Sequence, residues 1–276
     1  MNFQFIDEKT LDKKYPSIKP KYPNIFSTNK PEKSIINSQE EIEIINSFFN
    51  SLIIKSLDLI INTLDKKKDK LQKDILKIIN NLYTNKALLK ENLIKTKELL
   101  QSEDTIFICE TMAYFDAKKE QLAFTIPLTC RNIIFIEPYN MHKDYINNLD
   151  KNIHFNRERV IRTMLHEFIH IAILSEDWVY ENCIHDGNQE FYSKYQVNYL
   201  LLKNKHKSLL KKYAENNTDS YVSLIFIVLE MLHSSKEINL SLYSHQYSKQ
   251  KLIDEDPNTI RSNKVLNNLR KELYGN

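Results

Sequence analysis

Glycine is almost absent from this chain, and that absence restricts the folds that the sequence can support. Only two glycines, Gly187 and Gly275, occur among the 276 residues. Phosphate-binding loops of the P-loop and dinucleotide-binding types need glycines at fixed spacings, because the backbone must approach the phosphate closely. Two glycines so far apart cannot form either loop. Nucleotide-binding folds that are built around such loops are therefore excluded.

The first part of the chain has the apolar spacing of helices, and the middle part has the composition of strands. Three amphipathic segments between 40 and 100 favour an antiparallel helical unit, and Ser38 with Glu41 fits a capping box before the first. Aromatic and β-branched runs between 104 and 138 predict three short strands. The last run, at 132–138, is expected at a sheet edge that can cradle a peptide.

A second set of helices follows the strands. The segment 156–174 has a continuous helical pattern. Further helices are expected at 189–204 and 218–234, with Thr218 as the N-cap of the last. These elements predict a predominantly helical α+β fold with a small antiparallel sheet.

The two ends of the chain differ from this central domain, which covers 40–235. Residues 1–39 hold four of the seven prolines and show little periodic apolarity. They are predicted to form an extended leader that either docks on a binding partner or inhibits the domain. Residues 236–276 are predicted to form a polar C-terminal tail.

Charge, cysteine content and apolar runs narrow the classes of function and compartment. The net charge of +3 is too small to predict a nucleic-acid-binding surface, and three cysteines do not form a disulfide framework. The N-terminus lacks the apolar core of a cleavable signal peptide, and runs such as 223–232 are too short to span a bilayer. We expect no integral membrane segment, and either a cytoplasmic protein or one secreted by a signal-less route into a host cell.

The strongest chemical signal is the motif HEFIH at 166–170, inside the helical segment 156–174. Residues four apart lie one turn apart on the same face of a helix, so His166 and His170 can bind one Zn²⁺ ion. Glu167 is placed to take a proton from a metal-activated water and deliver it to a leaving amine. The motif therefore predicts a zinc-dependent hydrolase that acts on the peptide bonds of a protein or peptide substrate.

A catalytic zinc ion normally has three protein ligands, so one more has to be found. The candidates that follow the motif are Glu176, Asp177, Glu181, His185, Asp186 and Glu190. Asp177 follows the helix closely enough for a short turn to return it to the metal. Glu190 has the spacing of a gluzincin ligand, so both assignments stay open on spacing alone.

The motif and the residues after it resemble the aspzincins, the family of deuterolysin and peptidyl-lysine metalloendopeptidase. That family has H-E-x-x-H followed by G-T-x-D-x-x-Y, and the matching stretch here is LSEDWVY at 174–180. The resemblance implies a zincin-like fold, with Asp177 as the third zinc ligand and Tyr180 as a donor to the oxyanion. Leu174 and Ser175 stand where the family has Gly and Thr.

A second block, NNTDSY at 216–221, resembles the family stretch that opens a helix beneath the substrate pocket. The resemblance covers about 40–232, and it implies that Asp219 lines the pocket and favours lysine at P1′. Val222 stands where the lysine-specific members have a second acid, a glutamate.

Three hypotheses of function are carried forward. The first is a zinc endopeptidase of aspzincin type, acting as a bacterial effector or toxin. The second is a gluzincin-like peptidase with Glu190 as the third ligand. The third is a non-catalytic binding module, in which the helices of 40–100 carry the function and the HEFIH motif is degenerate.

Overall fold

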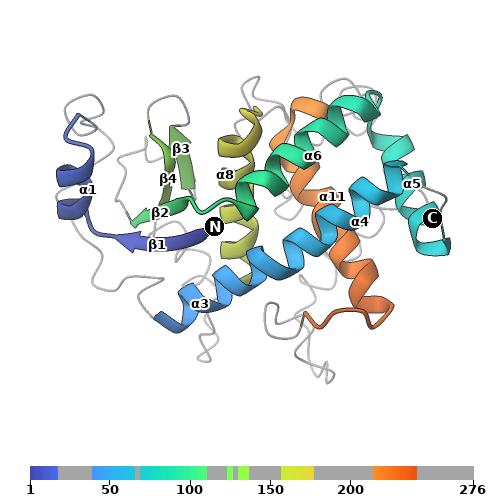
Figure 1. Cartoon of the computed structure of the whole chain (residues 1–276), viewed down its shortest axis with the longest axis horizontal. Helices are drawn as coiled ribbons and strands as arrows, with labels where there is room; N and C mark the ends of the chain where they lie inside the picture. Colours follow the sequence, from blue (N-terminus) through green and yellow to red (C-terminus); the bar gives the residue numbers. More distant parts are fainter. Residues whose placement is uncertain are drawn as a thin grey trace, which may run out of the picture. The chain divides into compact units, whose positions relative to one another are not determined.

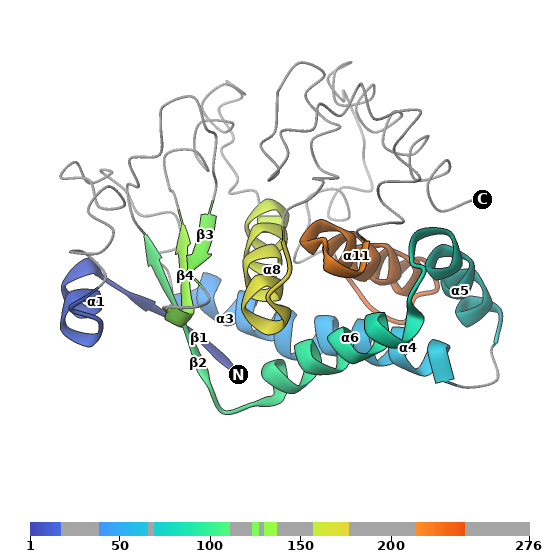
Figure 2. The same cartoon turned by 90° about the horizontal axis from the view of Figure 1, so that it is seen from above.

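The chain folds into helices and one small sheet, drawn in the computed structural model of Figure 1 and Figure 2. The structure describes residues 1–17, 39–65, 69–110, 123–126, 130–136, 157–176 and 214–240. These residues form a predominantly helical α+β protein, as the sequence predicts. The chain divides into unit 1, Met1–Asn50 with Leu99–Ile171, and unit 2, Ser51–Glu98 with Ala172–Asn276.

Unit 1 contains a four-stranded sheet in the order β1-β2-β4-β3. The strands are β1 (Asn2–Ile6), β2 (Thr105–Glu110), β3 (Ala123–Ile126) and β4 (Cys130–Ile136). Strands β1, β2 and β4 are parallel, and only β3 is antiparallel to its neighbour β4. The prediction of an antiparallel sheet is therefore wrong. The long helical connection between β1 and β2 is the kind of crossover that parallel neighbours need.

Strand β4 has a neighbour on each side, β2 and β3. The expectation that this strand forms the sheet edge is therefore wrong, and β3 is the edge strand beside it. Runs such as Ile106–Cys109 and Ile133–Ile136 are buried on both faces. Near-continuous apolar strands are typical of parallel sheets covered on both sides, which explains why the alternating pattern of an edge strand is missing.

The N-terminal residues are part of unit 1. Strand β1 pairs along its length with β2, and helix α1 (Glu8–Lys14) follows, capped by Asp7, whose Oδ1 accepts the Thr10 N–H at 2.7 Å. The side chains of Phe3, Ile6 and Leu11 are buried. The prediction of an extended leader is therefore wrong for residues 2–14, while residues 18–38 lie outside the described residues.

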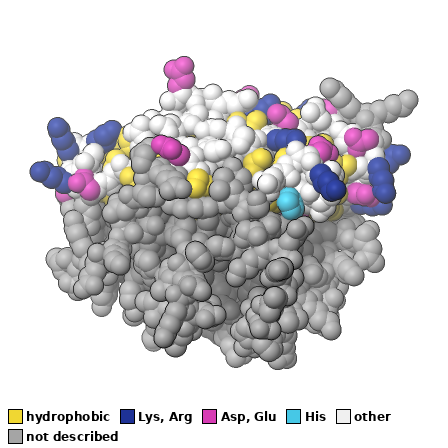
Figure 3. Space-filling view, turned by 90° about the horizontal axis from the view of Figure 1, so that it is seen from below, with side chains coloured by type: hydrophobic (Ala, Val, Ile, Leu, Met, Phe, Trp, Pro, Cys, Tyr) yellow, Lys and Arg dark blue, Asp and Glu magenta, His cyan; other side chains and the backbone are white. Residues whose placement is uncertain are grey.

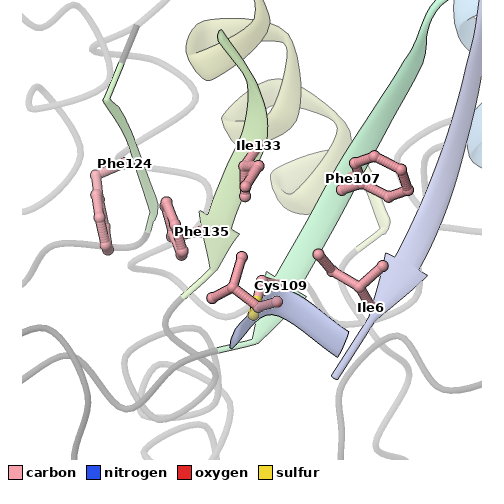
Figure 4. Packing of buried hydrophobic residues seen from close by; sticks show 7 residues of the cluster. Ile6, Phe107, Cys109, Phe124, Ile133 and Phe135 are labelled. Carbon is pink, nitrogen blue, oxygen red and sulfur yellow. The ribbon is translucent and has the colours of Figure 1, made fainter. Parts of the chain in front are cut away.

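One face of the sheet packs against α1 through a compact apolar cluster (Figure 4). The ring centroids of Phe124 and Phe135 are 4.7 Å apart in a stacked pair. The cluster consists of Ile6, Leu11, Phe107, Cys109, Phe124, Ile133 and Phe135. These side chains come from all four strands and α1, so the N-terminal segment is needed to close this part of the core.

Helices α3 (Gln39–Ser47) and α4 (Ile54–Asp65) are joined by a π-helical segment, η2 (Phe48–Ile53). The side chains of Phe48 and Phe49, at the start of this segment, are both buried. By length and composition alone, Ile42–Asp65 is long and apolar enough to cross a membrane, and 44% of its most apolar window is buried inside the protein. The buried core helix of a soluble protein passes the same test, so the absence of a membrane segment stays a prediction.

Unit 2 is helical in its described residues. It contains α4, α5 (Lys70–Leu82), most of α6 (Lys86–Gln101), a short 3₁₀ turn η4 (Ala214–Asn216) and α11 (Thr218–Ser234). The helices between 40 and 100 and the helix 218–234 are confirmed. The Tyr83 hydroxyl donates to the Ser220 carbonyl of α11 at 2.8 Å, which ties the end of α5 to α11. The helix predicted at 189–204 lies outside the described residues.

The surface of unit 2 carries exposed ion pairs between its helices and within them. Lys90 pairs with Asp65, and Lys97 pairs with Asp58, both at 2.6 Å. Basic and acidic side chains are interspersed on the face shown in Figure 3. Exposed pairs of this kind contribute little to stability, so the fold depends on its apolar core.

Candidate functional site

The HEFIH motif lies in α8 (Arg157–Ile173), a helix whose opposite side is held in the core of unit 1. Phe168, in the middle of the motif, contacts Phe3 and Phe49 edge to face, with ring centroids 6.4 and 6.0 Å away. The other buried apolar residues of this helix are Val160, Ile161, Met164, Leu165, Ile169 and Ile171. A helix fixed in this way is a rigid base for side chains that must meet at one point.

The imidazoles of His166 and His170 converge. Their Nε2 atoms are 3.1 Å apart, and the ring planes are inclined by 76°. Two nitrogens that bind one tetrahedral zinc ion at about 2.0–2.1 Å are separated by about 3.3 Å. The pair therefore fits a shared metal ion, with Nε2 of each ring as the donor atom. In the absence of a metal, one Nε2–H can donate to the other ring.

Glu167 lies between the two histidines in sequence and is 6% exposed. His170 is buried, while His166 is half-buried and reaches the surface. Burial in an environment of low dielectric strengthens the interaction of a carboxylate with a nearby cation or proton donor. The two imidazoles can bind a cation, and Glu167 supplies a buried carboxylate next to His166 in the sequence.

Leu174, the first residue after α8, has a left-handed backbone with φ of 53° and is 50% exposed. Glycine takes this conformation at little cost, whereas the Cβ of leucine makes it unfavourable. Leu174 is the position where the resemblance places a glycine. The backbone at this residue is therefore one that favours glycine, although the side chain is leucine.

The structure brings together the two blocks that the sequence singled out after the motif, and both belong to unit 2. Glu176 pairs with Asn217 in an isolated parallel bridge. Its N–H donates to the Asn216 carbonyl at 2.9 Å, and its own carbonyl accepts the Thr218 N–H at 3.0 Å. The hydroxyls of Ser175 and Thr218 are 2.8 Å apart and buried. The block at 174–176 is thus held directly against the block at 216–221.

The N-cap of α11 is Asn217, so the prediction of Thr218 as the cap is wrong by one residue. The Thr218 hydroxyl donates to the Glu176 carbonyl at 3.2 Å, and so serves the bridge rather than the helix start. Asp219 follows in the first turn of α11 and is 3% exposed. A carboxylate there interacts favourably with the positive end of the helix dipole.

Unit 2 contains a buried polar network that the sequence analysis did not predict. It includes two residues of the block at 216–221 and its flank, Tyr221 and Glu215. The carboxylate of Glu215 accepts the N–H of Thr84 at 2.6 Å and its hydroxyl at 2.9 Å. The Tyr221 hydroxyl donates to the Glu215 carbonyl and accepts from Asn92 Nδ2, both at 2.8 Å. Burial raises the pKa of Tyr221, the hydrogen bond from Asn92 opposes this, and the charge of Glu215 adds to it. The only sequence signal for this network was Tyr221, in the block at 216–221.

Several predicted site residues lie outside the described residues. They are Asp177, Tyr180 and Glu190, together with the weaker candidates Glu181, His185 and Asp186. Within the ranges that the structure describes, no group of three His, Cys, Asp or Glu side chains is arranged to hold a metal ion. The third ligand therefore stays a prediction.

Comparison with known proteins identifies no relative of this chain. No family model, curated protein or solved structure matches the chain. The function has to be argued from the residues of the site.

Proposed function

We propose that this chain is a zinc-dependent endopeptidase with a zincin-like fold, similar to the aspzincins. The observation that carries the proposal is the 3.1 Å separation of the His166 and His170 Nε2 atoms on a helix anchored in the core. The buried Glu167, which is next to His166 in the sequence, supports a hydrolytic role, because a metal site that only stabilises a fold does not need a base. The mixed sheet and the helix that carries the motif are compatible with a zincin-like fold.

The residues divide into three roles. His166, His170 and Asp177 would hold the zinc ion, which when bound supplies Lewis acidity and lowers the pKa of a water molecule. Glu167 would accept a proton from the attacking water and return it to the leaving amine. Tyr180 donates its O–H to the oxygen on which negative charge develops. Asp219 would favour a lysine side chain at P1′, since a buried carboxylate selects a cation.

The proposal is tested first by the metal content and cleavage activity of the purified chain. We expect one zinc ion per chain and cleavage of a peptide library, with Lys enriched at P1′ if Asp219 acts as proposed. Glu167→Ala should keep the zinc and lower cleavage by about 10²–10⁴-fold, the usual contribution of a general acid–base group. A chain that takes up no stoichiometric zinc would favour the binding-module hypothesis.

The third ligand is tested by a pair of variants. Asp177→Ala should lower zinc affinity, whereas Glu190→Ala should leave it unchanged. Loss of zinc in Glu190→Ala alone would replace this assignment with the gluzincin-like one. Cleavage retained by Glu167→Ala would remove Glu167 from the mechanism.

A further inference from the structure

The carboxylate of Glu215 is a buried acidic group that the chemistry proposed above does not use. Glu215 lies in the 3₁₀ turn η4 of unit 2 and is 7% exposed. Among the described residues, no basic side chain forms an ion pair with it. A carboxylate that is buried without a cation is costly unless hydrogen-bond donors surround it. The groups that bind Glu215 therefore act as a receptor for an anion.

The receptor is the turn that joins α5 to α6. The Oε1 atom of Glu215 accepts the N–H of Thr84 at 2.6 Å, the Thr84 hydroxyl at 2.9 Å, and the N–H of Asn85. Successive backbone N–H groups that converge on one point form a concavity that binds anions. Hydrogen bonds to a charged acceptor are roughly twice as strong as those between neutral groups. Three donors from two neighbouring residues thus meet at this one oxygen atom.

This receptor is distinct from the cap of helix α6. Asn85 caps the helix itself, because its Oδ1 atom accepts the Leu88 N–H and its carbonyl accepts the Leu89 N–H, both at 3.0 Å. The N–H groups that bind Glu215 belong to the two residues before α6 begins at Lys86. Helix α6 is therefore capped without Glu215, and the positive end of its dipole adds to the attraction for an anion.

The main chain of Glu215 is fixed as well as its side chain. Its carbonyl accepts the Tyr221 hydroxyl of α11 at 2.8 Å and the Nδ2 of Asn92, a residue of α6, at 3.3 Å. Glu215 and Thr84 are 131 residues apart in the sequence. The contact therefore joins η4 and the first turn of α11 to the turn between α5 and α6.

We propose that the Thr84–Asn85 turn is a binding site for a small carboxylate, which the chain fills with its own Glu215 side chain. Occupation of this site holds η4 and the start of α11 in place. The inference is independent of the proposed zinc site, because its residues all lie in unit 2 and none is a proposed ligand of the metal.

The test removes the internal ligand and offers a substitute to the full chain. Glu215→Ala removes a group of the size of an acetate ion, so sodium acetate is the probe, compared with sodium chloride at equal ionic strength. Asp69→Ala is the matched control, because Asp69 is the N-cap of α5 and its Oδ1 accepts the Gln72 N–H at 2.8 Å. Its removal opens an ordinary, exposed helix N-terminus. Urea unfolding and amide exchange are measured for each variant.

We expect Glu215→Ala to lower the urea midpoint and to speed amide exchange at Asn217 and Ser220 by about 10–100-fold. Acetate should reverse both changes with a saturable dependence on its concentration, whereas chloride should not. Asp69→Ala should show no response specific to acetate. If Glu215→Ala is unfolded in buffer, acetate should restore its helical circular dichroism, and a failure to do so would overturn the inference.

Two further variants test the site from either side. Glu215→Gln keeps an acceptor oxygen and leaves the site filled, so it should be destabilised less than Glu215→Ala and should not respond to acetate. Adding Thr84→Val to Glu215→Ala removes one donor and should weaken acetate binding by about tenfold. An equal response to acetate in Glu215→Ala and Asp69→Ala, or a response that Thr84→Val leaves unchanged, would refute the proposed site.

Discussion

Leu174 holds a backbone conformation that costs energy for every residue type except glycine. With φ of 53°, its Cβ crowds the following carbonyl, at a cost of about 1–2 kcal/mol. Its side chain is half exposed, so little packing is lost when it is removed. We therefore predict that Leu174→Gly raises the free energy of unfolding by about 1 kcal/mol, after the greater freedom of glycine in the unfolded chain is subtracted.

Urea unfolding of the variant measures this effect. The control is Leu88→Gly, because Leu88 is the other exposed large apolar residue of the described chain but lies inside α6. There glycine should lower stability by about 1 kcal/mol. A loss of stability in both variants would mean that the conformation at Leu174 is not strained.

Tyr221 gives a second prediction at the level of one residue, and it concerns pH. Burial raises its pKa above the value of about 10 in the unfolded chain, so the native state keeps a proton that the unfolded state loses. Its contribution to stability is complete below pH 10 and is lost as the pH rises above it. Tyr221→Phe should cost about 1–3 kcal/mol at neutral pH, because Asn92 and the Glu215 carbonyl lose a buried partner.

The stability of Tyr221→Phe should then fall less steeply than that of the wild-type chain between pH 10 and 12. Urea unfolding across this range checks the slope. Parallel curves for the two proteins would show that another group governs alkaline unfolding.

The residues of the site differ in how far the sequence could reveal them. His166 and His170 were predicted because a spacing of four in a helix determines their proximity. Glu215 and Asn92 could not be predicted, because their contact joins segments 123 residues apart. The Ser175–Thr218 contact is non-local in the same way, although the resemblance had named both blocks.

At the scale of the element, the helices were predictable and the sheet was not. Helices α5, α6, α8 and α11 follow their local apolar spacing to within one or two residues. Strand β1 has only five residues, and it pairs with β2, which begins about 100 residues later at Thr105. A pairing between segments so far apart cannot be predicted from local sequence patterns. The sequence predicted three consecutive short strands joined by short connections, a pattern that favours antiparallel pairing. The parallel arrangement depends on β1, which was not predicted as a strand.

The outer edge of β1 is closed by one side chain of α3, Asn46, and one of η2, Asn50. Asn46 accepts the Phe3 N–H at 2.7 Å and donates to the Phe3 carbonyl at 3.2 Å. Asn50 donates to the Met1 carbonyl at 3.0 Å. Amide side chains here take the place of a further strand, which protects an edge that would otherwise pair with another chain.

We predict that Asn46→Ala lowers the free energy of unfolding by about 2 kcal/mol, because both backbone groups of Phe3 lose their partner. The variant should also associate at high concentration through the open edge. Urea unfolding and light scattering measure the two effects. Asn50→Ala is the control, since it removes one exposed hydrogen bond and should cost less than about 0.5 kcal/mol. Equal effects in the two variants would argue against an edge-closing role for Asn46.

At the scale of the whole molecule, each unit is assembled from two separated stretches of chain. Unit 1 combines 1–50 with 99–171, and unit 2 combines 51–98 with 172–276. The boundary between Ile171 and Ala172 falls inside α8, one residue after His170. A division of the chain into consecutive segments cannot describe this arrangement, because the pairing of distant stretches depends on tertiary contacts.

The proposed metal site should couple to the stability of the entire chain. An ion that binds only the folded state raises the free energy of unfolding by mass action, by about 2.7 kcal/mol when free zinc is 100 times its dissociation constant. We therefore predict a higher urea midpoint in zinc than in a chelator. His170→Ala should remove this increase, because the convergent pair of Nε2 atoms is lost.

Two controls make this prediction specific to the site. Mg²⁺ should not replace zinc, because it prefers oxygen ligands and holds its water, whereas two imidazoles suit zinc. Glu167→Gln should keep the full zinc-dependent increase, since Glu167 acts on a proton and is not a proposed ligand. An equal increase in the wild-type chain and in His170→Ala would place the bound zinc elsewhere on the chain. It would thereby separate the stability effect from the proposed chemistry.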